Sequence, residues 1–285
     1  MTASASGGTV RNVLSIAGSD PSGGAGIQAD LKTFAALGVY GCAAVTALTA
    51  QNTMGVFGVF PVPGEFLRQQ LDAVFADVRI DAVKIGMLGS AAAIRTIAEV
   101  LRIHQPRFVV LDPVLRATTG AQLLATDAIA TLCDELLPLV TLVTPNATEA
   151  GALVGVNAPR TVTGARDVAA LLVKRGARAV LITGGHLEDD AHSVDVLHDG
   201  LRIYTTSVER VPAGDTHGTG CTLSSAIAAL LARGRALPEA CAEAQQFVAD
   251  AIVRSVDLSA GDGARPVHQL GRLWADATGH ARASE

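Results

Sequence analysis

The run DTHGTGCT at residues 215–222 has the residue types and spacing of a helix start that binds an anion. It opens a stretch of small and apolar residues with no Asp, Glu, Lys or Arg from 216 to 232. The first turn of a helix offers free backbone N–H groups at the positive end of the helix dipole, where an anion binds well. We expect the same field to lower the pKa of the Cys221 thiol; an ordinary buried helix with a small apolar cysteine is the alternative. The predicted anion site consists of Gly218, Thr219, Gly220 and Cys221.

A second polar cluster, AGSDPSGGAG at residues 17–26, lies between a strand-like and a helix-like segment. Its glycines let the backbone approach a ligand closely, so we predict a ligand-binding loop, with a purely structural turn as the alternative. The spacing G-x-G-x-x-A from Gly24 also matches the dinucleotide fingerprint. That fingerprint needs an acidic residue at the end of the second strand, and no Asp or Glu occurs between Asp30 and Glu65. No Lys-Ser or Lys-Thr pair directly follows the glycines, which excludes a Walker loop.

Three more polar side chains follow strand-like segments. Gln51 ends the run TALTAQ, and its amide can both donate and accept hydrogen bonds, which suits the edge of a polar heterocycle or, alternatively, a solvated loop. Asp112 in VLDPV ends one strand, and Glu149 in TPNATEA follows another. Carboxylates that converge at strand ends suit Mg²⁺ bound together with a nucleotide phosphate. Each could instead be a carboxylate at the start of a helix.

The elements that position these residues are apolar runs of strand length alternating with stretches of helical periodicity. Strands that are apolar at nearly every position predict an α/β fold, with a mostly parallel sheet and helices on both faces. The pair Asp199-Gly200 predicts a hairpin of residues 194–198 and 201–205, hence an antiparallel edge. Ligand sites in such sheets gather at the carboxyl ends of the strands. The other predicted strands are 13–17, 40–48, 82–85, 108–111, 139–143 and 179–182. The predicted helices are 27–37, 65–75, 91–104, 128–137, 165–175, 218–233 and 237–255.

The amino-acid composition excludes several classes of protein. The chain has 285 residues, 49% of them hydrophobic and 17% charged, which excludes disorder over most of its length. A net charge of −5 argues against a nucleic-acid partner, and no apolar run approaches the 18 residues of a membrane-spanning helix. Four separated cysteines without a C-x-x-C pair indicate reduced thiols and a cytoplasmic protein. We predict one domain at residues 11–274, with flexible tails at 1–10 and 275–285.

Taken together, six segments closely resemble the hydroxymethylpyrimidine/phosphomethylpyrimidine kinases of thiamine biosynthesis, within the ribokinase-like superfamily. The resemblance implies a kinase with a ribokinase-like fold. It would transfer the γ-phosphoryl group of ATP to the hydroxymethyl group of 4-amino-5-hydroxymethyl-2-methylpyrimidine, and then phosphorylate the monophosphate to the diphosphate. It also implies Mg²⁺ and, commonly, a homodimer. The six segments are AGSDPSGGAGIQADLKTFAALGVYGCAAVTALTAQNT, KIGML, LDPV, TPNATEA, GGHL and THGTGCTLSSAIAALL.

The resemblance implies roles for individual positions. Gln51 would hydrogen-bond the aminopyrimidine, and the anion loop from Gly218 to Cys221 would lie over the transferring phosphate. Asp112 and Glu149 would organise Mg²⁺, directly or through water. The residues that would line the pyrimidine pocket are Gly18, Ala25, Met87 and Val114. The residues that would lie near ATP are Asn146, Thr183 and Gly185.

The chain departs from the family at several positions. Thr118 stands where a Lys near the nucleotide phosphates is common, and Thr183 replaces a frequent Lys before Gly-Gly-His. Most ribokinase-like enzymes carry an Asp general base where this chain has Cys221, and a thiolate is a weaker substitute. Two alternatives stay open: a pyridoxine or pyridoxal kinase on the same scaffold, and a catalytically silent pyrimidine-binding module.

Overall fold

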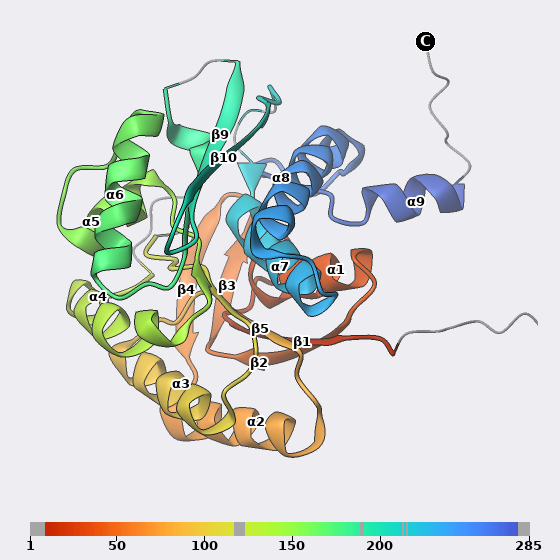
Figure 1. Cartoon of the computed structure of the whole chain (residues 1–285). Helices are drawn as coiled ribbons and strands as arrows, with labels where there is room; N and C mark the ends of the chain where they lie inside the picture. The colour runs from red at the N-terminus through yellow and green to blue at the C-terminus, as the bar shows by residue number, and fades with distance from the viewer. Residues whose placement is uncertain (1–8, 117–122, 189–190, 213, 215, 279–285) are drawn as a thin grey trace, which may run out of the picture.

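The fold is known from a computed structural model that describes residues 9–116, 123–188, 191–212, 214 and 216–278. Within these residues the central sheet has eight strands in the order β10-β9-β8-β7-β6-β5-β1-β2 (Figure 1). From β2 to β8 the neighbours pair in parallel, and β9 pairs antiparallel with both β8 and β10. The predicted parallel sheet with an antiparallel edge is confirmed. Its strands are β1 (Asn12–Ala17), β2 (Tyr40–Val45), β5 (Ala82–Ile85), β6 (Val109–Leu111), β7 (Leu142–Val143), β8 (Val180–Ile182), β9 (His192–His198) and β10 (Ile203–Glu209).

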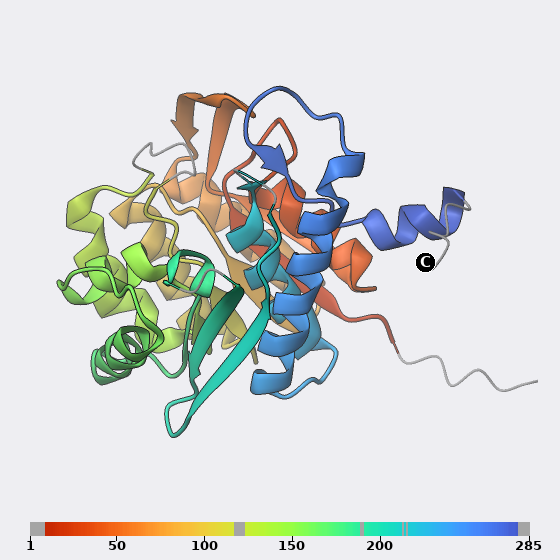
Figure 2. The same cartoon turned by 90° about the horizontal axis from the view of Figure 1, so that it is seen from above.

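Helices cover both faces of this sheet. Figures 1 and 2 show α1, α7 and α8 on one face and α2 to α6 on the other, while α9 projects away from the sheet. Successive strand residues point to opposite faces, so Leu14 and Ile16 join one buried cluster and Val13 joins the other. The helices are α1 (Gly26–Ala36), α2 (Gly64–Asp77), α3 (Ala91–His104), α4 (Thr126–Thr131), α5 (Ala147–Val154), α6 (Val162–Lys174), α7 (Thr219–Ala232), α8 (Leu237–Val253) and α9 (Gly271–Thr278).

Side-chain caps determine where several of these helices begin. The Ser90 hydroxyl accepts a hydrogen bond from the backbone of α3, and Thr161 does the same for α6. Asn146 and Glu149 form a reciprocal capping box at the start of α5, a helix that the periodicity did not predict. These caps orient the helices whose N-termini face the carboxyl edge of the sheet.

The predicted strand 40–48 is wrong in its extent. β2 ends at Val45: the Thr46 N–H makes the last hydrogen bond to β1, at the Ala17 carbonyl (3.0 Å), and the Thr46 hydroxyl donates to the Met87 carbonyl (2.6 Å). Beyond this point the chain leaves the sheet and forms a separate antiparallel hairpin, β3 (Ala47–Asn52) with β4 (Gly55–Pro61).

Smaller differences concern helix ends. The predicted helix 128–137 is α4 followed by a π-helical turn, Leu132–Leu136, and α9 extends to Thr278, past the predicted start of a flexible tail at 275. Short 3₁₀ turns occupy Leu137–Leu139, Gly184–His186 and Arg254–Asp257.

A two-stranded parallel pair, β11 (Thr216–His217) and β12 (Arg265–Pro266), connects the C-terminal segment to the start of α7. Among the described residues, none of the helices combines the length and apolar character needed to cross a membrane.

Candidate active site

The predicted anion loop lies at the start of α7, against the carboxyl edge of the sheet. Gly218 precedes the helix in the left-handed region, with φ of 85°, and the first helical hydrogen bond runs from the Thr222 N–H to the Gly218 carbonyl (2.9 Å). A Cβ on Gly218 would overlap the Gly24 carbonyl oxygen, so the anion loop packs directly on the glycine loop. Only glycine fits both this close approach and this φ angle.

Cys221 differs from its predicted ionisation. Burial raises the pKa of its thiol to about 12, although the Lys84 charge and a hydrogen bond from the Gly26 N–H both act to lower it. The predicted lowering by the helix start is therefore wrong, because desolvation of the thiolate outweighs the favourable charge and hydrogen bond. The thiol is protonated at neutral pH, which argues against a thiolate general base in this structure.

Thiol labelling checks this protonation state. Because only the thiolate is nucleophilic, we expect the iodoacetamide labelling rate of Cys221 to rise about tenfold per pH unit from pH 7 to 10 without a plateau. The rate is measured by mass spectrometry of the peptide that contains Cys221, with free cysteine as the control. Free cysteine should level off above its pKa of about 8.5. A plateau for Cys221 below pH 8 would contradict the assignment.

The glycine loop is organised around Asp20, a carboxylate with 1% of its surface exposed. It accepts hydrogen bonds from Ser22, from the Ala25 N–H (2.7 Å) and from the His217 ring (3.0 Å). Although burial alone would raise the pKa of Asp20, the hydrogen bonds from His217 and its other partners hold it well below the usual range. Asp20 therefore stays ionised and joins the glycine loop to the residue before the anion loop.

The residues predicted to line the ring pocket lie around this loop. A Cβ on Gly18 would come 3.1 Å from the Met87 sulfur, and Ala25 lies beside Gly218. Gln51 lies on β3, and its side chain is among the groups that lower the pKa of Asp20. Val114 lies further along the carboxyl edge of the sheet, where its N–H donates a hydrogen bond to the Asp112 carbonyl (2.9 Å). The structure thus brings Gly18, Ala25, Met87 and Gln51 together and leaves Val114 beside the acidic pair described next.

Asp112 and Glu149 form a buried acidic pair on the other side of the anion loop. Ser224, one turn into α7, donates to Asp112 (3.3 Å), while the Glu149 oxygens accept from the Leu115 N–H (3.3 Å) and the Asn146 N–H (3.0 Å). Burial raises the pKa of both carboxyls, and the neighbouring Asp112 charge raises the pKa of Glu149 further. A divalent cation would relieve this repulsion, so the pair fits Mg²⁺.

The number of ligands also fits Mg²⁺. No cluster of three or more potential metal-binding side chains is found within the described ranges. Mg²⁺ is usually held by one or two carboxylates together with water and substrate phosphate, so two carboxylates are sufficient. Glu149 has both roles that the sequence left open, since it caps α5 and also faces Asp112.

The three residues predicted near the nucleotide also meet. Asn146 and Thr183 form a parallel β-bridge, and the Thr183 N–H donates to the Pro145 carbonyl (3.1 Å). The adjoining turn is held by the buried Asp195, which accepts from the Gly184 N–H (2.7 Å), and by Arg210, which donates to the Gly185 carbonyl (2.9 Å). Thr118 and Asp215 lie outside the described residues.

A buried ion pair that the sequence analysis did not predict lies one helical turn of α7 away from the anion loop. Lys84 on β5 is fully buried and donates to both carboxylate oxygens of Asp30 on α1, at 2.8 and 2.9 Å. The hydroxyls of Ser15 (2.5 Å) and Ser225 (2.7 Å) also donate to Asp30. Burial alone would lower the pKa of Lys84, but the Asp30 charge outweighs it and raises that pKa. The sequence signal that could have predicted this ion pair is the lysine within the otherwise apolar strand AVKI.

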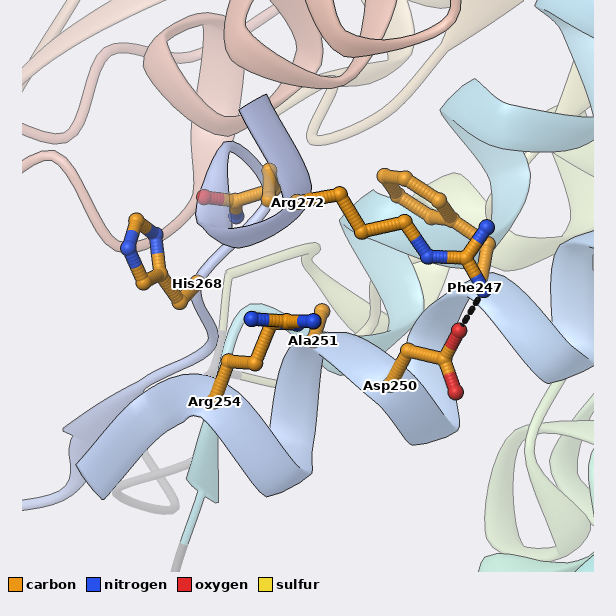
Figure 3. Close-up of a pocket in the computed structure, with 7 residues that line it drawn as sticks. Phe247, Asp250, Ala251, Arg254, His268 and Arg272 are labelled. Atoms are coloured by element: carbon orange, nitrogen blue, oxygen red, sulfur yellow. Dashed lines mark hydrogen bonds and ion pairs between the residues drawn. The ribbon is translucent and has the colours of Figure 1, made fainter. Parts of the chain in front are cut away.

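A small cavity of about 10 Å³ lies between α8 and α9 and is separate from these loops (Figure 3). It has room for about one water molecule. Arg254, His268 and Arg272 line it, and Arg272 pairs with Asp250 at its rim. It therefore contributes nothing to the candidate site.

The comparisons with known proteins show the family and the fold to which this chain is similar. The sequence pattern of a family described as phosphomethylpyrimidine kinase matches residues 20–268. The hydroxymethylpyrimidine/phosphomethylpyrimidine kinase of Salmonella typhimurium is 49% identical over 263 residues, which cover 92% of this chain and 98% of that protein. The ADP complex of Bacillus subtilis pyridoxal kinase superposes with a TM-score of 0.86 at 37% identity, over 93% of this chain and 99% of the other. The phosphomethylpyrimidine kinase of Clostridium difficile superposes with a TM-score of 0.75 at 40% identity, over 85% of this chain and 99% of the other.

Proposed function

The chain belongs to the phosphomethylpyrimidine kinase family, and we propose below which of its residues carry the activity. It is a phosphotransferase of thiamine biosynthesis that phosphorylates hydroxymethylpyrimidine and then its monophosphate, with ATP as the nucleotide substrate. The acceptor atom is the hydroxymethyl oxygen of 4-amino-5-hydroxymethyl-2-methylpyrimidine in the first step. In the second step it is a phosphate oxygen of the monophosphate.

The observation that carries the site assignment is the direct packing of the glycine loop on the anion loop. A ring bound against Gly18, Ala25 and Met87 presents its substituent to the backbone N–H groups at the start of α7. Gln51 hydrogen-bonds the amino edge of the ring, while the loop from Gly218 to Cys221 stabilises charge on the transferring phosphoryl group. Val114 closes the far side of the pocket.

Positioning and charge stabilisation account for the catalysis, as is usual in phosphoryl transfer. The protonated Cys221 thiol does not act as a base, and the monophosphate acceptor needs none, because a phosphate monoester is already largely anionic at pH 7. Asp112 and Glu149 would hold Mg²⁺, which would supply positive charge to neutralise the ATP phosphates. Asn146, Thr183 and Gly185 contact the nucleotide.

ADP release from Mg-ATP tests this function directly, with hydroxymethylpyrimidine, its monophosphate, pyridoxine and pyridoxal as acceptors. Turnover of both pyrimidines supports the assignment. Turnover of pyridoxine or pyridoxal alone would instead favour the second candidate, because two solved pyridoxal kinases share this scaffold at TM-scores of 0.85 and 0.86. Absence of turnover with every acceptor would favour a binding module.

Gln51→Leu tests where the ring lies. Removing the amide leaves the amino edge of the pyrimidine unpaired, which costs on the order of 1–3 kcal/mol and lowers kcat/KM roughly tenfold to more than a hundredfold. The control is Gln69→Leu, the same substitution at an exposed position of α2, which should leave kcat/KM unchanged. Unchanged pyrimidine turnover in Gln51→Leu would show that the ring lies elsewhere.

We further propose a cytoplasmic homodimer. The β3–β4 hairpin exposes large apolar side chains, including 72% of Phe57 and 65% of Phe60, and a second copy of the chain would bury them. Light scattering checks this, with an expected mass of about twice 29.1 kDa.

A further inference from the structure

The β3–β4 hairpin is interrupted by a bulge next to Gln51. Ala50 pairs with Gly58, whereas the next residue, Gln51, pairs with Val56, so β4 contains one extra residue at this point. A bulge bends the strand that carries it and increases the local twist. The hairpin therefore has two parts, which we call the base (residues 47–50 and 58–61) and the tip (residues 51–56). Gln51 belongs to the tip.

The base of the hairpin is held by the glycine loop. The Ser19 N–H donates to the Ala47 carbonyl (2.9 Å), and the Ser19 carbonyl accepts from the Thr49 hydroxyl (2.9 Å). The Thr49 N–H also donates to the Ser19 hydroxyl (3.2 Å). All three hydrogen bonds precede the bulge, where the strand changes direction. They fix the base but do not by themselves determine where Gln51 lies.

The tip is held by Thr53. This residue is 9% exposed, although the next residue, Met54, is 64% exposed. The Ala264 N–H donates to the Thr53 carbonyl (3.0 Å), and the Gly263 N–H donates to the Thr53 hydroxyl oxygen (3.1 Å). A Cβ on Gly263 would overlap the Thr53 carbonyl, so this close approach requires glycine for lack of space. The tip of the hairpin is therefore attached to a segment more than 200 residues away in the chain.

The same segment continues to the entrance of the anion loop. Ala264 directly precedes β12, and β12 pairs in parallel with β11, which ends at the residue before Gly218. The Val267 N–H then donates to the His217 carbonyl (3.3 Å). Residues 263–267 therefore connect the hairpin tip, which carries Gln51, to the anion loop.

We propose that Thr53 is a positioning residue for the pyrimidine, because its attachment to residues 263–264 fixes the hairpin tip and so places Gln51 against the ring. The proposal rests on the proposed function, in which Gln51 contacts the pyrimidine. Thr53 acts on the substrate through Gln51 and not by direct contact. The residues assigned to ATP come from other strands, so losing the attachment should weaken binding of the pyrimidine and leave binding of ATP unchanged.

Thr53→Val tests the proposal, because valine keeps the shape of the side chain but offers the Gly263 N–H no acceptor. We expect the KM values for hydroxymethylpyrimidine and for its monophosphate to rise about three- to tenfold, which corresponds to the loss of one hydrogen bond. The KM for ATP and kcat should stay unchanged, and Thr53→Ser, which keeps the hydroxyl, should restore the KM values. Unchanged pyrimidine KM values in Thr53→Val, or an equal rise for ATP, would overturn the proposal.

Thr141→Val is the matched control. The Thr141 hydroxyl oxygen also accepts from a backbone N–H, that of Val109 (3.0 Å), but Thr141 directly precedes β7 and so lies at the amino edge of the sheet. This variant should leave all KM values unchanged. If it raised the pyrimidine KM as much as Thr53→Val, the effect would be a general response to losing a threonine hydroxyl, against the proposal.

The double variant Thr53→Val with Gln51→Leu tests whether Thr53 acts through Gln51. Once the amide is removed, Thr53→Val should cause no further loss of kcat/KM for the pyrimidine, because two residues that act as one unit are not additive. Additive losses would overturn the proposal. If the unmodified enzyme phosphorylates neither pyrimidine, the proposed function fails; if Gln51→Leu is impaired and Thr53→Val is not, only the present inference fails.

Gly263→Ala provides a second route should Thr53→Val fold poorly. Its methyl group would overlap the Thr53 carbonyl, so the hairpin tip has to move away from residues 263–264. We expect the same pattern, in which the KM for hydroxymethylpyrimidine rises and the KM for ATP does not. A pyrimidine KM equal to that of the unmodified enzyme would contradict a positioning role for this contact.

Discussion

Replacing Lys84 by methionine is expected to lower the free energy of unfolding by about 3–5 kcal/mol, because the Asp30 carboxylate would remain buried without its counter-charge. Lys84 is fully buried and contacts both oxygens of Asp30, and no solvent is available to replace it. The hydroxyls of Ser15 and Ser225 would be the only partners left among those described. Urea unfolding at pH 7, followed by circular dichroism, measures the loss.

Two further variants test whether burial of the ion pair is the cause of this large loss of stability. Arg68→Met breaks two partly exposed ion pairs, with Asp72 (2.7 Å) and Glu99 (3.7 Å), and we expect it to cost less than about 1 kcal/mol. The double variant Lys84→Met with Asp30→Leu leaves neither charge buried, so it should recover part of the stability lost in the single variant. Equal costs for Lys84→Met and Arg68→Met would show that the buried pair contributes no more than a surface pair.

Replacing Gly218 by alanine is expected to lower kcat by about a hundredfold to a thousandfold, the effect of losing an oxyanion donor. The new methyl group would overlap the Gly24 carbonyl oxygen, so the anion loop has to move away from the glycine loop. The backbone N–H groups at the start of α7 would then no longer lie over the transferring phosphate. Steady-state kinetics with saturating pyrimidine and ATP measures the change.

Gly234→Ala is the control for backbone strain. Gly234 follows the other end of α7 with φ of 91°, and a Cβ there would meet no atom within 4 Å. This variant imposes similar strain without the overlap, so it should lose roughly 1–2 kcal/mol of stability and keep its kcat. If Gly218→Ala kept its kcat as well, the packing of the two loops would not matter for catalysis.

Several elements could be predicted because the signal is local. The helix 91–104 and the strand 82–85 were predicted with the bounds that the structure has, since apolar periodicity and the Ser90 cap mark them. The Asp199-Gly200 pair also predicted the β9–β10 hairpin, but not its bounds: the loop is residues 199–202, and the second strand begins at Ile203 and not at 201. The β2–β3 boundary could not be found in this way. Residues 43–48 stay apolar except for Thr46, so the sequence pattern does not mark the end of β2, and the hydrogen bond from the Thr46 hydroxyl to Met87 forms only in the folded chain.

Local patterns in the sequence were sufficient to predict the layered α/β fold, the glycine loop, the helix start at Gly218 and the family to which the chain belongs. Which buried groups remain charged depends on how distant segments pack in the folded protein. This packing raised the pKa of the Cys221 thiol, kept Asp20 ionised, and paired Lys84 with an aspartate 54 residues away in the chain. The physical reason is that backbone geometry and hydrophobic periodicity are encoded between near neighbours. Ionisation depends on desolvation and on charges that come together only when distant segments pack.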